Sequence, residues 1–209
     1  TVITLAPGID ITDESAGSSF TLNGDLVADK LWQLGAFSDT TGWPRAVAFY
    51  EQRLVFAGTA SQPQTIFFSQ GGDFENFERG TDNDDGLVYT IGSNEVNVIR
   101  YLASCRQLLV GTSGGEFVVR ASGFEDQLNP KNTQIKQQTT YGSANIQPMQ
   151  VGNATLFLQR AKRKLRELVF SNESDSYVAP DMTILAEHIT EGGIEEFAYQ
   201  QEPDSVAWC

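Results

Sequence analysis

The chain has 209 residues, of which 40% are hydrophobic and 20% are charged. These are ordinary values for a globular protein, and they exclude a disordered or fibrous chain. Asp and Glu number 27 against 14 Lys and Arg, so the net charge is −13, which argues against holding nucleic acid, although an acidic wall would let it pass. The longest apolar runs fall far short of the roughly 18 residues that a membrane-spanning helix needs.

Residues 1–43 do not follow the pattern that organises the rest of the chain. Gly, Pro, Asp and Ser punctuate short strand-like pieces, of which 31–37 is the most regular. We expect this stretch to be the edge of an N-terminal β region or a linker. The sequence starts without Met or a basic leader and stops inside a strand-like segment, so we also expect it to be part of a longer protein.

From residue 44 onward, pairs of short apolar strands recur. The runs 53–59 and 65–69 are joined by a polar interval, and a similar couplet returns at 107–112 and 116–120. Each couplet predicts an antiparallel hairpin, because the interval supplies turn residues and the runs supply β-branched and aromatic side chains.

The recurrence has a period of about 50 residues. Aligning the central strands on their second apolar position gives intervals of 54, 48 and 50 residues; the aligned residues are Leu54, Leu108, Leu156 and Val206. Repeats of about 40 to 50 residues built from about four strands are typical of propeller blades. We therefore predict an all-β fold over 44–209, a partial β-propeller of four-stranded antiparallel blades that is truncated at the C-terminus. A β-sandwich of irregular hairpins is the alternative.

One segment departs from the all-β pattern. Residues 184, 185, 188 and 189 are Ile, Leu, His and Ile, which share one face at helical spacing, with Asp181 as N-cap and Gly192 past the end. This predicts a short helix between blades. His188 is the only histidine, and its place on the apolar face favours a packed or hydrogen-bonded structural role over catalysis.

Two motifs have a catalytic or metal-binding interpretation beside a structural one. Ser113 satisfies the G-x-S-x-G pattern of serine hydrolases, but a strand follows it, so a hairpin turn is favoured. The acidic turn 82–86 has Ser93 where an EF-hand needs an acidic residue, which leaves an irregular Ca²⁺ site as the alternative to a solvated turn. Cys105 and Cys209 are far apart in sequence, so we expect no disulfide framework and a reducing compartment.

Basic and aromatic side chains gather in two further places. Five of the fourteen basic residues fall within seven positions: Arg160, Lys162, Arg163, Lys164 and Arg166. This segment predicts a solvated hairpin tip, or else a patch that docks an acidic neighbour, which is favoured over contact with DNA. Five aromatic residues would suit a sugar platform, although core packing is favoured: Trp43, Phe67, Phe68, Phe74 and Phe77.

Seven segments, taken in order, carry a resemblance that covers the chain from about residue 32. They are 32–38, 42–44 with 49–54, 69–77, 111–116, 166–168 with 175–177, 181–189 and 199–203. Together they resemble the tail tubular or nozzle proteins of short-tailed bacteriophages and their prophage relatives, which bear β-propellers.

The resemblance implies a non-enzymatic virion structural protein, assembled in the bacterial cytoplasm into the tail. It implies rings formed with other copies and with portal and adaptor subunits, through which DNA passes without specific binding. It implies no cofactor, no metal and no membrane partner. The alternative from another class is a propeller that binds or cleaves glycans at the host cell surface, and a serine hydrolase using Ser113 is a weaker third.

Overall fold

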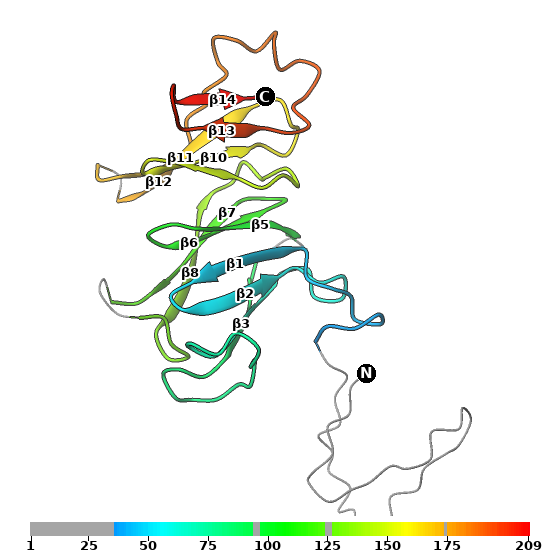
Figure 1. The fold of residues 1–209 in the computed structure, drawn as a ribbon, viewed down its shortest axis with the longest axis vertical. Coiled ribbons are helices and arrows are strands. Elements are labelled where there is room, and N and C mark those ends of the chain that lie inside the picture. Colours follow the sequence, from blue (N-terminus) through cyan, green and yellow to red (C-terminus); the bar gives the residue numbers. More distant parts are fainter. Residues whose placement is uncertain (1–35, 94–96, 124–126, 174) are drawn as a thin grey trace, which may run out of the picture.

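The computed structural model describes residues 36–93, 97–123, 127–173 and 175–209. Within these ranges the protein is all-β, as predicted, with fourteen strands and no helix. The strands form three four-stranded antiparallel sheets and one two-stranded hairpin, which follow one another in chain order (Figure 1). The N-terminal region expected over 1–43 falls for the most part on residues 1–35, which lie outside the described ranges.

Each sheet is a meander whose strands neighbour one another in sequence order. The first contains β1 (Ala46–Tyr50), β2 (Arg53–Ala57), β3 (Thr65–Phe68) and β4 (Leu87–Thr90). The second contains β5 (Ile99–Ser104), β6 (Leu108–Thr112), β7 (Glu116–Ala121) and β8 (Thr133–Thr139). The third contains β9 (Met149–Val151), β10 (Ala154–Leu158), β11 (Leu165–Ser171) and β12 (Ser176–Val178). The hairpin contains β13 (Ala198–Gln200) and β14 (Val206–Trp208).

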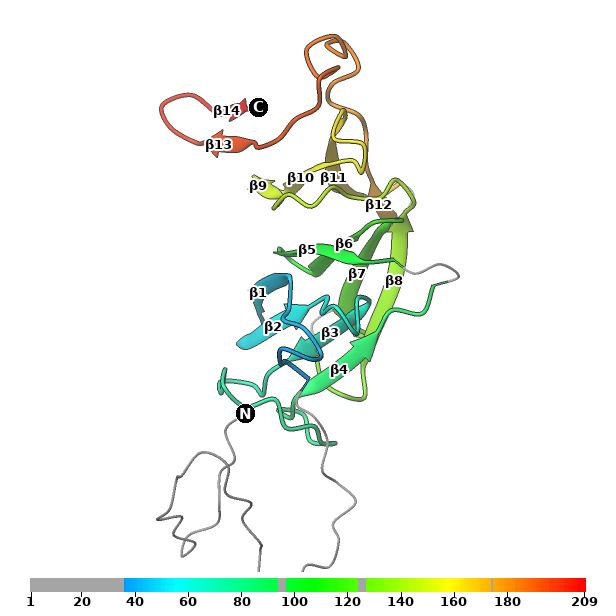
Figure 2. The same cartoon turned by 90° about the vertical axis from the view of Figure 1, so that its right-hand side faces the viewer.

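The sheets are stacked, and their first strands form one column. Figure 2 shows β1, β5, β9 and β13 above one another along the long axis, and β1 contacts β5 as β9 contacts β13. In the first and third sheets a two-residue turn joins the first strand to the second. In the first sheet Tyr50 pairs with Arg53 across a two-residue turn in which Glu51 and Gln52 both have positive φ, 45° and 61°, as a turn matching the strand twist requires.

Apolar side chains between successive sheets hold the stack together. One cluster joins the first two sheets and includes Val55 and Phe68 with Leu108. The next joins the second and third sheets and includes Tyr101 and Leu109 with Phe157. A third covers the far face of the third sheet. Because the inner sheets are buried on both faces, β6 and β10 are continuously buried strands rather than alternating ones.

The directions in which the central-strand side chains point correct the predicted alignment of the repeats. Val55 packs toward the second sheet, so its neighbour Leu54 points to the opposite face, the one that precedes the first sheet in the stack. Leu108 also points to the preceding side of its own sheet, because it packs against the first sheet. Leu156, however, belongs to the cluster on the far side of the third sheet. Its neighbour Phe157 packs against the second sheet, so Phe157 is the residue equivalent to Leu108. A shift of one residue reverses the side-chain direction in a strand.

The prediction of a helix over 181–189 is wrong, because the segment forms successive turns. The amide of Ala186 bonds the carbonyl of Thr183, and the amide of Ile189 bonds that of Ala186, each three residues back. The amide of Met182 bonds the carbonyl of Leu165 in β11. An amide donor near the expected helix start is thus bound to a neighbouring strand, which fixes this end of the segment to the sheet.

The side chains of this segment also point opposite to the prediction. Ile184, Leu185 and Ile189 are exposed, with Leu185 94% accessible. His188 is exposed as well, so the expectation of a packed histidine is wrong. The apolar residues at helical spacing therefore do not face a core in the described structure.

Candidate functional site

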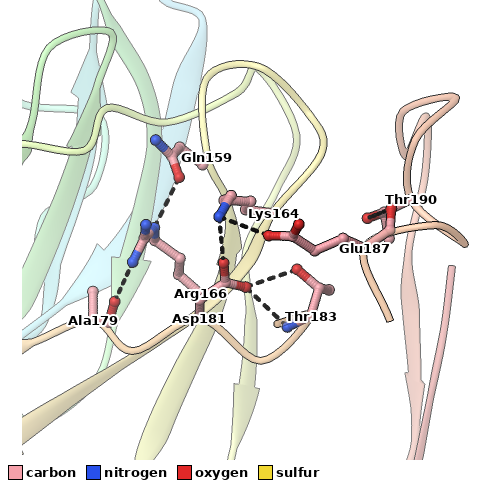
Figure 3. Close-up of polar contacts among 8 residues, drawn as sticks. All are labelled: Gln159, Lys164, Arg166, Ala179, Asp181, Thr183, Glu187 and Thr190. Atoms are coloured by element: carbon pink, nitrogen blue, oxygen red, sulfur yellow. Dashed lines mark hydrogen bonds and ion pairs between the residues drawn. The ribbon is translucent and has the colours of Figure 1, made fainter. Parts of the chain in front are cut away.

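The basic segment singled out in the sequence forms the connection between β10 and β11 and the first residues of β11. Figure 3 shows the polar contacts of two of its members, Lys164 and Arg166. Leu158 pairs with Leu165 at the base of this hairpin. Above the base, the amide of Gln159 donates to the carbonyl of Lys164, and the amide of Lys162 donates to the carbonyl of Gln159. The hairpin therefore has a folded tip, and two of its basic side chains, Lys162 and Lys164, reach the segment 181–195.

Lys164 joins the hairpin to that segment through two carboxylates. Its Nζ lies 2.9 Å from Oδ2 of Asp181 and 3.1 Å from Oε1 of Glu187. The other oxygen of Asp181 accepts hydrogen bonds from the amide and hydroxyl of Thr183, at 2.9 and 2.7 Å. Burial alone would raise the pKa of Asp181, but the hydrogen bonds from Lys164 and Thr183 outweigh it and lower the pKa to about 2.

Lys162 makes a second connection to the same segment. Its Nζ lies 2.6 Å from Oε2 of Glu195, and its carbonyl accepts the amide of Ile194 at 2.8 Å. Ile194 is buried in the apolar cluster on the far face of the third sheet. Charge pairing and backbone bonding together fix this end of the segment, although the ion pair itself is exposed and contributes little to stability.

Arg166 is a structural residue of the sheet. It is 9% exposed, and its Nε donates to Oε1 of Gln159 while Nη1 donates to the carbonyl of Ala179, at 2.9 and 2.6 Å. Its guanidinium carbon lies 3.5 Å from the ring centroid of Tyr141, a cation–π contact. The side chain is therefore bound within the protein and is not displayed at the tip.

Arg160 and Arg163 are the two most exposed members of the basic segment. Nη1 of Arg160 donates to the carbonyl of Ser113 at 3.4 Å. Arg163 lines a cavity of about 300 Å³ with five neighbours, which are Gln159, Ala161, Lys164, Glu187 and Thr190. The tip therefore presents less positive charge to a partner than its sequence indicates, because Lys162, Lys164 and Arg166 are bound to groups of the same chain.

Ser113 lies in the turn between β6 and β7, as favoured from the sequence. Its Oγ accepts the amide of Val98 at 3.1 Å. Within the same turn, Oγ1 of Thr112 donates to the carbonyl of Gly115 at 2.7 Å. His188, the only histidine of the chain, lies on the exposed loop after β12 and not in this turn. The glycines around Ser113 serve a hairpin turn.

Arg53 occupies the position that a cation would take at the acidic turn. The side chain is 3% exposed. Its two terminal nitrogens donate to four carbonyl oxygens at 2.6 to 3.2 Å, those of Ser69, Asn83, Asp84 and Asp85. Burial lowers the pKa of Arg53, and neighbouring carboxylates led by Asp84 oppose this. Among the described residues no group of three or more His, Cys, Asp or Glu is placed to hold a metal ion.

The five aromatic residues considered for a sugar platform do not come together. Phe68 is in the core between the first two sheets. Phe67 and Phe77 pack on the opposite face of the first sheet, each with Phe37 at centroid distances of 5.0 and 6.2 Å. Phe74 contacts Phe49 at 5.3 Å. Trp43 is 63% exposed.

Glu116 is a buried polar residue that the sequence analysis did not single out. It begins β7 and is 1% exposed. Oγ of Ser143 donates to its Oε1 at 2.7 Å, and the hydroxyl of Thr139 donates to its Oε2. A glutamate directly before the apolar run Phe-Val-Val is the signal that could have identified it, because Glu is rarely buried without partners.

Both cysteines are free thiols, Cys105 half-buried and Cys209 exposed. In the part of the chain that the structure describes, no helix is long and apolar enough to cross a membrane. No protein-family model matches this sequence, and no curated protein is significantly similar to it.

Proposed function

We propose that residues 44–209 are part of a β-propeller in a non-enzymatic tail protein of a short-tailed bacteriophage or prophage. The observation that carries this proposal is the stack of three four-stranded meanders in chain order, with first strands in one column (Figure 2). Propeller blades have this strand order and bury their faces against neighbouring blades. The column of first strands would then lie closest to the propeller axis.

The resemblance to tail tubular or nozzle proteins supports the functional part of the proposal. Several of the segments that carry it lie in connections rather than strands, such as 69–77 after β3 and 181–189 after β12. Connections bear function more often than core strands do. In the proposed role the protein assembles with further copies and with portal and adaptor subunits in the virion tail.

The surface that would face the axis is nearly neutral. The strands β1, β5, β9 and β13 contain no Asp or Glu, and Arg100 is their only charged residue. The acidic residues concentrate elsewhere, for example in the exposed loop 73–85. Weak adhesion of passing DNA would therefore arise from the net charge of −13 on the whole chain, which repels phosphate at long range.

Electron microscopy and DNA binding together test this proposal. Negatively stained images of the purified protein should show rings with a central opening. Filter binding at physiological salt should show only weak retention of double-stranded DNA. A protein that stays monomeric at high concentration, or that binds DNA tightly, would be incompatible with the proposed role.

A glycan-binding propeller is the second candidate, favoured by one observation. Trp43, Phe49 and Phe74 are all exposed at the first sheet, and aromatic faces pack against sugar rings. Incubation with bacterial surface polysaccharide separates the candidates. Retention of the polysaccharide, or the appearance of new reducing ends, would support this second function, and the absence of both would leave the tail protein as the better proposal.

A further inference from the structure

Glu116 connects the second sheet to the chain segment that leads into the third. Its two carboxyl oxygens accept hydrogen bonds from Thr139, the last residue of β8, and from Ser143, four residues later. Thr139 also pairs with Glu116 across the β7–β8 ladder. The amide of Ala144 then bonds the carbonyl of Leu158 in the third sheet at 2.8 Å. One buried carboxyl group thus contacts both ends of the connection 139–144.

The connection has no room to move past the second sheet. The amide of Ser143 bonds the carbonyl of Thr112 at 2.8 Å. Gly142 has a φ of +73°, and a Cβ at this position would lie 2.4 Å from the carbonyl oxygen of Ser113. A side chain there would clash with backbone, so the segment already lies against the β6–β7 turn. Displacing Ser143 requires that its bond to Glu116 be broken.

The groups around this carboxyl compensate a charge on it only in part. Tyr101 of β5 faces it with a fully buried hydroxyl. Arg166 of β11 faces it from the third sheet, but its Nε and Nη1 donate to Gln159 and Ala179. Burial raises the pKa of Glu116 above its ordinary value of 4.5. Hydrogen bonds from Thr139, Ser143 and the backbone of Tyr141, together with the charge of Arg166, lower it by a smaller amount.

We propose that Glu116 is a protonation-sensitive joint between the second and third sheets. With its proton bound, the neutral carboxyl stays buried, one of its oxygens donates to the neighbouring hydroxyl of Thr139 or Ser143 while the other accepts, and the connection 139–144 holds the sheets together. When the proton is lost to solvent, the charged carboxylate favours an open arrangement in which water reaches it. The opening would expose the apolar cluster around Tyr101, Leu109 and Phe157.

The sign of the pH dependence follows from proton linkage. The closed joint binds the proton more tightly than the open one, in which Glu116 regains its ordinary pKa. The closed state is therefore most stable at pH values below the ordinary pKa. It loses stability as the pH rises toward the raised value, by up to about tenfold in the opening equilibrium per pH unit for a single proton.

Amide hydrogen exchange on the full chain tests the joint. The amides of Ser143 and Ala144 report opening, and the amide of Ser69, bonded to the carbonyl of Leu54 in the first sheet, is the internal reference. After correction for the intrinsic pH dependence of exchange, protection at Ser143 and Ala144 should fall with rising pH and that at Ser69 should not. The variant Glu116→Gln, which cannot ionise, should lose this difference, whereas Glu196→Gln at an exposed position should keep it.

A second variant keeps the proposal testable should Glu116→Gln fail to fold. Ser143→Ala removes a hydrogen bond that lowers the pKa of Glu116 in the closed joint, so the fall in protection should still begin near the ordinary pKa but should continue to a higher pH. The same pH profile in wild type and Glu116→Gln would overturn the proposal, and so would protection that does not vary with pH in the wild type. An unshifted profile in Ser143→Ala would likewise count against it.

Discussion

Arg53 and Asp85 are joined by a hydrogen bond of 2.6 Å, from Nη1 of the arginine to the backbone carbonyl of the aspartate. The bond connects the start of β2 to an acidic turn 32 residues later in the chain. A guanidinium therefore organises the carbonyl oxygens of this turn.

Replacing Arg53 should release the acidic turn. In Arg53→Met the four carbonyl oxygens lose their charged donor, and we expect the free energy of unfolding to fall by about 3 kcal/mol, since bonds to charged groups are worth about 1.5 to 3 each and water replaces some of them. Urea denaturation measures this loss. Arg45→Met, at an exposed arginine, is the matched control and should change stability by no more than about 0.5 kcal/mol.

Calcium should not stabilise the wild-type protein. The carbonyl oxygens of 83–85 already bind Arg53, so few of the oxygen ligands that Ca²⁺ needs remain at the turn. Thermal unfolding in millimolar Ca²⁺ and in a chelator should give the same midpoint. A calcium-dependent rise in Tm would show that the irregular site exists after all.

Acid should weaken the attachment of the 181–195 segment. The folded-state pKa of Asp181 is lowered to about 2 from 3.8, so its contribution is present above pH 3.8 and is lost as the pH falls toward 2. Stability measured by urea denaturation across this window should fall less steeply in Asp181→Asn than in the wild type. Glu191→Gln, at an exposed residue of the same segment, should retain the wild-type slope.

Truncating Phe157 should test the assignment of its face. Its side chain is fully buried between the second and third sheets, so Phe157→Ala should cost about 3 to 5 kcal/mol. Phe170→Ala removes the same atoms from a residue of the third sheet that is 43% exposed, and it should cost much less. Equal losses in denaturation midpoints would contradict the register described here.

Leu185 separates the observed turns from the predicted helix. Because its side chain is 94% exposed, Leu185→Ser should change the free energy of unfolding by no more than about 0.5 kcal/mol. A helix packed on its apolar face would lose several times as much. Thermal or urea denaturation distinguishes the two, with Ile194→Ala, at a buried residue nearby, as the destabilising comparison.

The sequence predicted the central strands well and missed the outer strand β8, for a physical reason. Strands such as β6 and β10 are buried on both faces and are therefore continuous apolar runs. The outer strand β8, with sequence TQIKQQT, is half-exposed and mostly polar, so it lacked a signal. Burial on both faces also explains the wrong alignment of the third repeat. Leu156, Phe157 and Leu158 are all apolar, so the sequence has no alternation of polar and apolar residues from which their faces could be assigned.

The basic segment was found from its composition, but whether its side chains are free or ion-paired depends on residues distant in the sequence. Lys164 is bound to Asp181 and Glu187, and Lys162 to Glu195, partners that lie 17 to 33 residues away. The helix over 181–189 failed for the same reason. Asp181 and Met182 are held by Lys164 and Leu165 of the hairpin, so tertiary contacts overrode a local spacing that favoured a helix.

The serial order of the sheets shapes how the molecule would come apart. The principal strand contacts between sheets join β1 and β2 to β5, β8 to β12 and β9 to β13, each between neighbours along the chain. In such a linear array, every layer is supported only by the layers beside it. Fraying would start at an end and travel inward one layer at a time, and the second and third sheets, which have neighbours on both sides, would be the last to melt.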